Sequence, residues 1–536
     1  MSKSQYLLSR KTIGLLGLFV IVLCISLLAN KIPRIATKIL HLPSEIQRIV
    51  KFNLSPNIAV TSRDKISIQP LTEMRATSAT GVLRVNPTNP RYFTDGGGKA
   101  VYLTGSHTWS NLQDSGGSPF PPKFDYATYL GFLQKNNHNF FRLWTWETSG
   151  PWIQTTVKNY WFYPIPYQRI GSDKALDGEP KFDLTQFNQA YFDRLRERVK
   201  EAGNRGIYVS VMLFNGWSVD NGKGNFHSSN PWRTHPFNKA NNINGIDGDF
   251  NGDNNGEEIH TLVSPAVTAI QDAYVRKVID TVNDFDNVLY EISNESNKDS
   301  QDWQYHMTTY IKNYERRKPK QHPVGMTAFD ELKSNSPLFD SPADWISPIG
   351  DIDERPVASG KKVILADTDH LCGICGNNPQ WVWKSFTNGE NPIFMDAYDN
   401  AFVLGSTLIN QAPPDSLNYS PWVVLRRYLG YTLTYANRMN LAAMTPQGDL
   451  ASTGYCLANP ASSGAEYLVY APSGGRTIVD LSATKHELVA EWLNPSTGIV
   501  TSGIKTAGGG NRSFFPPFSG EAVLYIKDAS PTYSQS

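Results

Sequence analysis

The feature that most constrains this chain is an alternation, between residues 101 and 395, of short apolar runs with amphipathic stretches. Strands that alternate with helices predict a parallel sheet, and eight such strands fit a (β/α)8 barrel with long loops; a doubly wound open sheet is the alternative. No G-x-G-x-x-G follows the first run, which argues against a dinucleotide-binding sheet. The eight expected strands are Val101–Leu103, Phe140–Trp144, Ile207–Leu213, Val288–Ile292, Val324–Thr327, Trp345–Ile346, Val363–Leu365 and Ile393–Met395.

Apolar residues at helical spacing predict helices between these strands. In the longest stretch Tyr191, Leu195 and Val199 recur every fourth residue, and Gly203 is a typical end signal. The expected helices are Tyr126–Lys135, Leu184–Gly203, Ser264–Asp284, Trp303–Arg317 and, after the last strand, Trp422–Arg438.

The pattern changes at both ends of this region. Residues 440–536 contain short alternating runs separated by Gly, Pro, Ser and Asn, which predict a small all-β sandwich after a barrel domain over 83–439. Residues 31–82 show no strong pattern and are expected to be a spacer. The expected strands of the sandwich include Glu466–Tyr470, Thr477–Asp480, Leu488–Leu493 and Ala522–Ile526.

The N-terminal run Thr12–Ala29 carries no charge, and as a helix it would rise about 27 Å, close to the thickness of a bilayer core. It predicts a signal anchor within residues 1–30 that tethers an extracytoplasmic body to the membrane. A cleaved signal peptide, which would release a secreted protein, is the alternative. Basic residues flank the run on both sides, so charge does not fix its orientation.

Composition narrows the function. Lys and Arg number 50 and Asp and Glu 49, and this balance argues against a nucleic-acid binder. Aromatic residues make up 12% of the chain, which fits an aromatic-lined carbohydrate cleft but also an ordinary core. The four cysteines exclude a disulfide scaffold; Cys372 and Cys375 form either a local disulfide or two free thiols. No pattern indicates an oligomeric state.

Polar residues follow several of the expected strands, where a barrel builds its active site. Asn294-Glu295 follows the fourth strand, and Asp367 and Asp369 follow the seventh. Two carboxyl groups on either side of a scissile bond are what glycoside hydrolysis requires, and different surroundings can keep one protonated and the other ionised. The residues expected to bind the sugar are His107, Trp109, Arg142, Trp144, Trp217, Asn294 and His370.

Asn294-Glu295 after strand four resembles the signature of glycoside hydrolase clan A, the retaining (β/α)8 glycosidases. More closely, Tyr102–Trp109, Asn139–Trp144 and the C-terminal sandwich are similar to the apiosidase-like family of glycosidases, over about residues 83–528. The resemblance implies that Glu295 is the acid/base. Clan A usually has a glutamate nucleophile after strand seven, whereas this chain offers Asp367 or Asp369, of which Asp367 directly follows the apolar run.

Other interpretations of the same residues stay open. Glu295 could be a helix-entry residue, because Asn294 and Ser296 are common N-cap types. Arg142 could pair with a carboxylate inside the barrel, and the strand-seven aspartates could structure a loop. The alternative functions are a non-catalytic carbohydrate-binding or adhesion protein and a carbohydrate lyase or transglycosidase.

A second motif suggests a structural calcium ion, although the chemistry itself requires no cofactor. Residues 247–258 match the loop D-x-[DN]-x-[DN]-G-x5-E, whose oxygen ligands suit seven-coordinate calcium. The preceding residues are not helical, so this is no complete EF-hand, and a surface loop rich in Asp, Asn and Gly is the alternative. The expected ligands are Asp247, Asp249, Asn251, Asp253 and Glu258.

Overall fold

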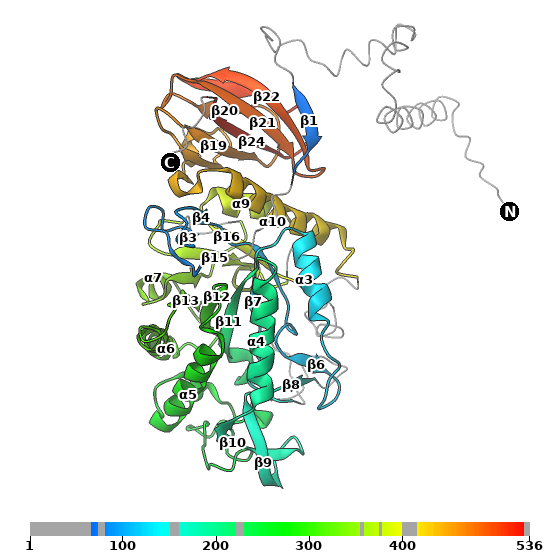
Figure 1. Cartoon of the computed structure of the whole chain (residues 1–536), viewed down its shortest axis with the longest axis vertical. Coiled ribbons are helices and arrows are strands. Elements are labelled where there is room, and N and C mark those ends of the chain that lie inside the picture. The colour runs from blue at the N-terminus through cyan, green and yellow to red at the C-terminus, as the bar shows by residue number, and fades with distance from the viewer. Residues whose placement is uncertain are drawn as a thin grey trace, which may run out of the picture. The chain divides into compact units, whose positions relative to one another are not determined.

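The computed structural model describes one compact unit within residues 66–536 (Figure 1). The described residues are 66–72, 81–150, 160–220, 230–353, 358–374, 378–398 and 415–529. The expected anchor, Thr12–Ala29, lies outside them. No helix in these described ranges is long and apolar enough to cross a membrane.

Eight parallel strands form the barrel, in the spatial order β5-β16-β15-β14-β13-β12-β11-β7. They are β5 (Gly105–His107), β7 (Phe140–Leu143), β11 (Tyr208–Asn215), β12 (Val288–Asn294), β13 (Val324–Thr327), β14 (Trp345–Ser347), β15 (Val363–Asp367) and β16 (Asn391–Met395). The second to eighth expected strands coincide with strands of this sheet, which confirms a parallel barrel in place of the open sheet.

The first expected strand was wrong. Val101–Leu103 does not belong to the barrel, because Ala100–Val101 (β4) pairs with Phe93–Thr94 (β3) in a small antiparallel sheet that also contains Arg84–Val85 (β2). The barrel strand is the polar Gly105–His107, which pairs with β16. The apolar run was therefore a misleading signal, because the barrel strand beside it is short and carries the polar residues Ser106 and His107.

The barrel closes between β5 and β7 through Asn139. Its backbone N–H donates to the carbonyl of Thr104 (3.1 Å), and its side-chain oxygen accepts the N–H of Thr104 (2.9 Å). Gly105 makes the close approach possible, since a Cβ there would lie 2.1 Å from the carbonyl oxygen of Phe140. A side-chain amide and a glycine thus take the place of a regular ladder.

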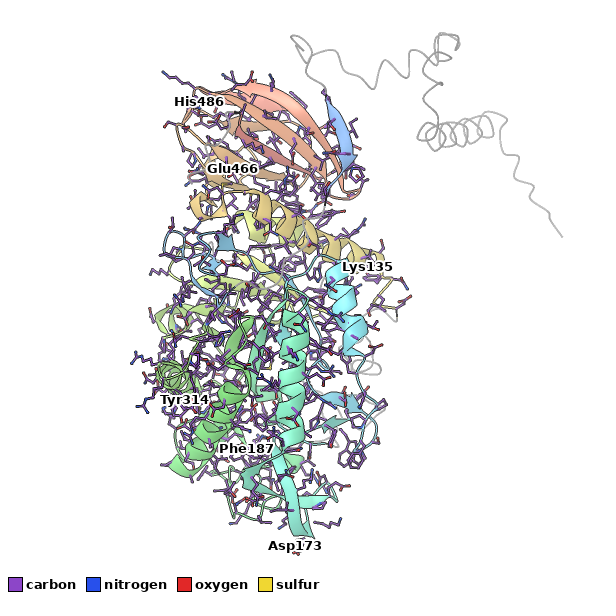
Figure 2. All side chains as sticks on the ribbon, in the orientation of Figure 1. Lys135, Asp173, Phe187, Tyr314, Glu466 and His486 are labelled. Carbon is purple, nitrogen blue, oxygen red and sulfur yellow. The ribbon has the colours of Figure 1, made fainter. Side chains whose placement is uncertain are left out.

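Helices flank the strands (Figure 1). The stretch expected to be helical over Leu184–Gly203 divides in two: Leu184–Phe187 ends strand β10 (Pro180–Phe187), which pairs with β9 (Tyr167–Lys174), and the helix begins after Asn188, whose side chain caps it. Figure 2 labels Phe187 at this junction. The helices are α3 (Tyr126–Lys135), α4 (Gln189–Gly203), α5 (Pro265–Val282), α6 (Gln301–Glu315), α7 (Ser336–Asp340), α8 (Thr368–Leu371), α9 (Gln380–Thr387) and α10 (Ser420–Arg438).

The C-terminal region is all-β, as expected. Its seven-stranded antiparallel sheet has the order β1-β22-β21-β24-β19-β18-β17, and β20 pairs with β23 beside it. β1 comes from the stretch expected to be a spacer and pairs with β22. The strands are β1 (Ser67–Pro70), β17 (Thr445–Pro446), β18 (Cys456–Asn459), β19 (Glu466–Ala471), β20 (Thr477–Asp480), β21 (Glu487–Asn494), β22 (Ile499–Ala507), β23 (Asn511–Phe514) and β24 (Ala522–Asp528).

Strand β19 of this sheet is buried on both faces, and its alternate residues point to opposite sides. In β19, Leu468 and Tyr470 pack with residues of α9 and α10, such as Trp383. Tyr467 and Val469 pack on the other side, in a cluster that includes Val479 of β20. The sheet is therefore joined to the barrel by an apolar layer, while the sandwich and its boundaries stay predictions.

Gly325 of β13 provides a test of barrel packing. A Cβ at this position would lie 1.9 Å from the indole of buried Trp345, so Gly325→Ala forces a large side chain to move. We expect the free energy of unfolding, measured in urea, to fall by about 3 kcal/mol. Gly131→Ala is the control, because Gly131 lies exposed in α3 with open space around it. An equal loss in the control would contradict the packing argument.

Candidate active site

Arg142 of β7 is the centre of the site. Its Nε donates to Glu291 (3.0 Å), and Nη2 donates to Glu291 and to Asn294 (2.7 Å). Nη1 donates to Asp367 (3.0 Å) and Asp369 (2.8 Å). The five N–H groups of the guanidinium fork therefore all have protein partners. The pairing with a barrel carboxylate, expected as an alternative for Arg142, is present.

The buried charges determine the protonation of Arg142. Burial alone lowers the pKa of Arg142, but Glu291, Asp367 and Asp369 outweigh this effect and raise it well above its ordinary value. The guanidinium is consequently a permanent cation within a group of carboxylates. It fixes strands two, four and seven of the barrel relative to one another.

The two strand-seven aspartates have different surroundings. Asp367 ends β15, as expected, and its side chain is 1% exposed. Its carboxylate accepts hydrogen bonds from His107 Nε2 (3.0 Å to Oδ2), from Arg142 and from the N–H of Asp369 (3.0 Å), and thereby caps α8. Burial raises its pKa, but His107 and Arg142 outweigh burial and hold the pKa of Asp367 well below its ordinary value.

Asp369 is the less enclosed of the two. Its side chain is 8% exposed; Oδ2 accepts the bond from Arg142, and Oδ1 accepts no hydrogen bond from the described residues. Burial raises the pKa of Asp369, Arg142 opposes this, and the negative charge of Asp367 raises it further, so the net shift is upward. Neighbouring carboxyl groups whose pKa values are pushed apart are a common feature of acid–base sites.

Glu295 follows strand four in an unusual backbone conformation. Its φ of +43° lies in the left-handed region, which a residue other than glycine rarely adopts. Gly216 leaves room for it, since a Cβ there would lie 1.9 Å from the carbonyl oxygen of Glu295, and the indole N–H of Trp217 donates to the Glu295 carboxylate. Glu295 is no helix-entry residue, because α6 begins at Gln301 after Ser300.

The aromatic residues expected to bind sugar form two groups. Trp144 is buried; the ring of His107 stacks on it at 5.5 Å and the guanidinium of Arg142 lies 5.0 Å from its centre. Trp109 is also buried and meets Trp144 edge-on. Trp217 is half-buried. Trp144 and Trp109 pack beside Arg142 and its carboxylates, whereas Trp217 has exposed surface that a ligand could contact.

Four buried nitrogen atoms at the site lack a hydrogen-bond partner among the described residues: Asn294 Nδ2, His370 Nε2, His107 Nδ1 and Trp144 Nε1. His370 Nδ1 contacts the Ser347 hydroxyl (2.7 Å), and burial and then Arg142 lower its pKa to about 4, so its ring is neutral at pH 7. An unpaired buried polar group costs roughly 1–3 kcal/mol. A ligand rich in hydroxyl groups would satisfy such atoms.

Sequence reasoning missed two carboxylates at the site. Glu291 is fully buried and binds Arg142 through both oxygens. A signal existed, because Arg142 and Glu291 are charges inside apolar runs, and buried charges are normally paired. Glu147, beyond the end of strand two, contacts His260 (3.1 Å), and no pattern in the sequence joins these distant residues.

Comparison with known proteins bears on the fold of the chain. The family DUF6298, a domain of unknown function, matches residues 153–341, and no curated protein sequence matches the chain. A solved glycoside hydrolase family 5 structure from Bacteroides vulgatus is similar with a TM-score of 0.55 and 13% identity, covering 86% of this chain and 97% of that one. Another structure, a glycoside hydrolase, has a TM-score of 0.51 and 13% identity, covering 84% and 97%. The chain shares the barrel fold of these structures.

The loop expected to bind calcium follows strand three of the barrel. The Asp249 carboxylate accepts the backbone N–H groups of Gly252 (2.7 Å), Asp253 (3.1 Å) and Asn254 (3.0 Å), as in a self-structured polar loop. In the described ranges no group of three or more His, Cys, Asp or Glu side chains is arranged to hold a metal. The calcium ion stays a prediction.

The cysteine pair of the sequence falls at the edge of the described part. Cys372 is disulfide-bonded, whereas Cys375 lies outside the described residues. Cys372 follows α8, the short helix that carries Asp369 and His370. A disulfide therefore anchors the chain directly after Asp369 and His370.

Arg142→Met tests how far Arg142 and the carboxylates around it stabilise the barrel. The substitution leaves Glu291 buried without a counter-charge, so we expect the free energy of unfolding in urea to fall by about 3–5 kcal/mol. The double variant Arg142→Met/Glu291→Met removes that uncompensated charge and should recover at least half of the loss. A single variant as stable as the wild type would show that the pair contributes nothing.

Proposed function

We propose that the protein is a glycoside hydrolase that cleaves glycosidic bonds in a polysaccharide or glycan. One observation carries the proposal: Asn294, which precedes Glu295, and Asp369 bind the same Arg142 guanidinium at 2.7 and 2.8 Å. The Asp369 carboxylate and the residue that precedes Glu295 are thus bound to one rigid cation. The barrel fold and the resemblance to clan A support the same function.

Glu295 is the general acid/base in this proposal, and Asp369 is the nucleophile. In the first step Asp369 Oδ1 attacks the anomeric carbon, the bond to the leaving oxygen breaks, and Glu295 gives that oxygen its proton. In the second step Glu295 takes a proton from water, the water oxygen attacks the same carbon, and Asp369 is released. The configuration of the sugar is retained.

The sequence alone ranked Asp367 first as nucleophile, and the contacts favour Asp369. Both oxygens of Asp367 accept hydrogen bonds from the protein, and its side chain is the more deeply buried. A nucleophile needs one oxygen that can face the sugar. Asp369 Oδ1, without a hydrogen-bond donor among the described residues, meets that requirement.

The sugar-binding role is proposed for atoms that the protein leaves unpaired. Asn294 Nδ2 can donate to a hydroxyl group, and the free nitrogen atoms of His370 and His107 can donate or accept according to their tautomers. The half-buried Trp217 can pack on a sugar face beside Glu295. The uncharged run Thr12–Ala29 further supports an enzyme that is anchored outside the cytoplasm, or secreted after cleavage.

A non-catalytic carbohydrate-binding protein is the second candidate. It is favoured by the aspartates after strand seven, where clan A usually has glutamate. Incubation of the full-length protein with a panel of plant and microbial polysaccharides separates the candidates. Released reducing ends support a hydrolase, and unsaturated products would indicate a lyase. Binding to a glycan without any release would overturn the proposal in favour of the binding protein.

A further inference from the structure

Glu147, a carboxylate outside the proposed reaction, is linked to Glu295 through hydrogen bonds of intermediate residues. Its side chain is 12% exposed, and Oε1 accepts the N–H of Asn215 (2.7 Å) and a hydrogen bond from His260 Nε2 (3.1 Å). Burial raises the pKa of Glu147, but His260 and His235 outweigh it and lower the pKa to about 2. Glu147 is thus ionised over the range in which enzymes usually work.

A first chain of contacts leads from Glu147 to the Glu295 carboxylate. Asn215 ends strand three; its side-chain amide donates to the Thr145 carbonyl (2.9 Å), and its oxygen accepts the N–H of Trp217 (3.1 Å). Trp217 in turn donates its indole N–H to Glu295. Because Glu147 binds the backbone of Asn215, it fixes the position of the turn from which Trp217 donates to the Glu295 carboxylate.

A second chain of contacts leads to the backbone of Glu295. The fully buried ring of His260 stacks on Trp303 (4.6 Å, 21°) and so has one orientation. Its Nε2 faces Glu147, and its Nδ1 contacts the Ser296 hydroxyl (3.1 Å), which also bonds Ser293 (2.6 Å). Ser296 directly follows Glu295, so this chain fixes the peptide on its C-terminal side.

Both chains act on a residue in a strained conformation. A non-glycine residue in the left-handed region is strained and persists only where its surroundings enforce it. The two series of contacts meet at Glu147. We propose that Glu147 is a positioning residue that holds Glu295 in the orientation from which it protonates the leaving oxygen. This inference rests on the proposed role of Glu295.

The test compares two substrates of the same sugar, one with an alkyl leaving group and one with an activated aryl leaving group. An alkoxide must be protonated as it leaves, whereas a dinitrophenolate leaves without help, so only the alkyl substrate needs a correctly placed acid. For Glu147→Ala we expect kcat on the alkyl substrate to fall about 100-fold with KM within about threefold. The burst of the aryl leaving group should change less than about threefold.

Conservative variants separate positioning from a general loss of structure. Glu147→Gln keeps an oxygen that can accept both hydrogen bonds and should restore the alkyl rate to within about tenfold of wild type. Ser296→Ala removes the hydroxyl group that contacts His260 and so interrupts the second series of contacts with a minimal change. It should show the same preference for the aryl substrate. The test therefore stays decisive if Glu147→Ala does not fold. Glu315→Gln is the matched control, because Glu315 is a buried carboxylate paired with His322 (2.8 Å) elsewhere in the barrel.

Equal losses on both substrates in the Glu147 and Ser296 variants would overturn the inference, as would full activity on the alkyl substrate. Failure of this inference is distinct from failure of the proposed function. The proposed function is decided by the hydrolytic activity of the wild type and of Glu295→Gln. If the wild type hydrolyses no glycan, a crystal structure of Glu147→Ala decides the positioning. A residue 295 that leaves the left-handed region would support it, and an unchanged φ would overturn it.

Discussion

Glu295→Gln is expected to lower kcat for glycan hydrolysis by about 10³-fold or more, within the range that general acid–base groups contribute. The amide has the same shape and can still accept the indole N–H of Trp217, but it carries no acidic proton for the leaving oxygen and cannot deprotonate water. The measurement is the rate of reducing-end release from the glycan that the wild type cleaves.

Binding must be retained for this result to identify a catalytic residue. The dissociation constant of the glycan, measured by calorimetry, should change less than about threefold, because the unpaired atoms of Asn294 and His370 remain in place. Burst release of an activated aryl group should also persist, since that step needs no acid. A variant that hydrolyses the glycan at the wild-type rate would refute the proposed role.

The barrel could be predicted from the sequence because most of its strands are buried on both faces. Such strands are mostly apolar runs, and Val288–Ile292 and Val363–Ala366 are clear examples. The first strand could not be found in this way. Gly105–His107 is polar, because His107 points to Asp367 and Gly105 permits the contact that closes the barrel.

The placement of Glu295 after strand four and of the two aspartates at and after the end of strand seven could be predicted from the sequence. The choice between Asp367 and Asp369 could not, since it depends on partners from other strands: His107 on strand one and Arg142 on strand two occupy the oxygens of Asp367. The contact between Glu147 and His260 joins two loops 113 residues apart, and no local pattern encodes it.

We expect Asp369→Asn to lose activity and Asp367→Asn to lose stability. Without its ionised nucleophile, Asp369→Asn should lose about 10³-fold or more in kcat and keep most of its stability, because its carboxamide oxygen can still accept the Arg142 bond. Asp367→Asn removes a charge that His107 and Arg142 share, so we expect the free energy of unfolding to fall by about 3 kcal/mol while measurable hydrolysis remains. Kinetics and urea unfolding of both variants measure the difference.

The pH profile provides an independent check. The pKa of Asp369 is raised by burial and by the charge of Asp367, and only the ionised form attacks, so activity should increase as the pH rises through this pKa. Removing the charge of Asp367 lowers the pKa of Asp369, and the acidic limb of the Asp367→Asn profile should therefore move to lower pH. Azide should also restore turnover to Asp369→Ala, because the small anion can occupy the vacated space and attack the anomeric carbon. If instead azide rescues Asp367→Ala, and Asp369→Asn remains active, then Asp367 is the nucleophile and the hydrogen bonds around it reorganise when substrate binds.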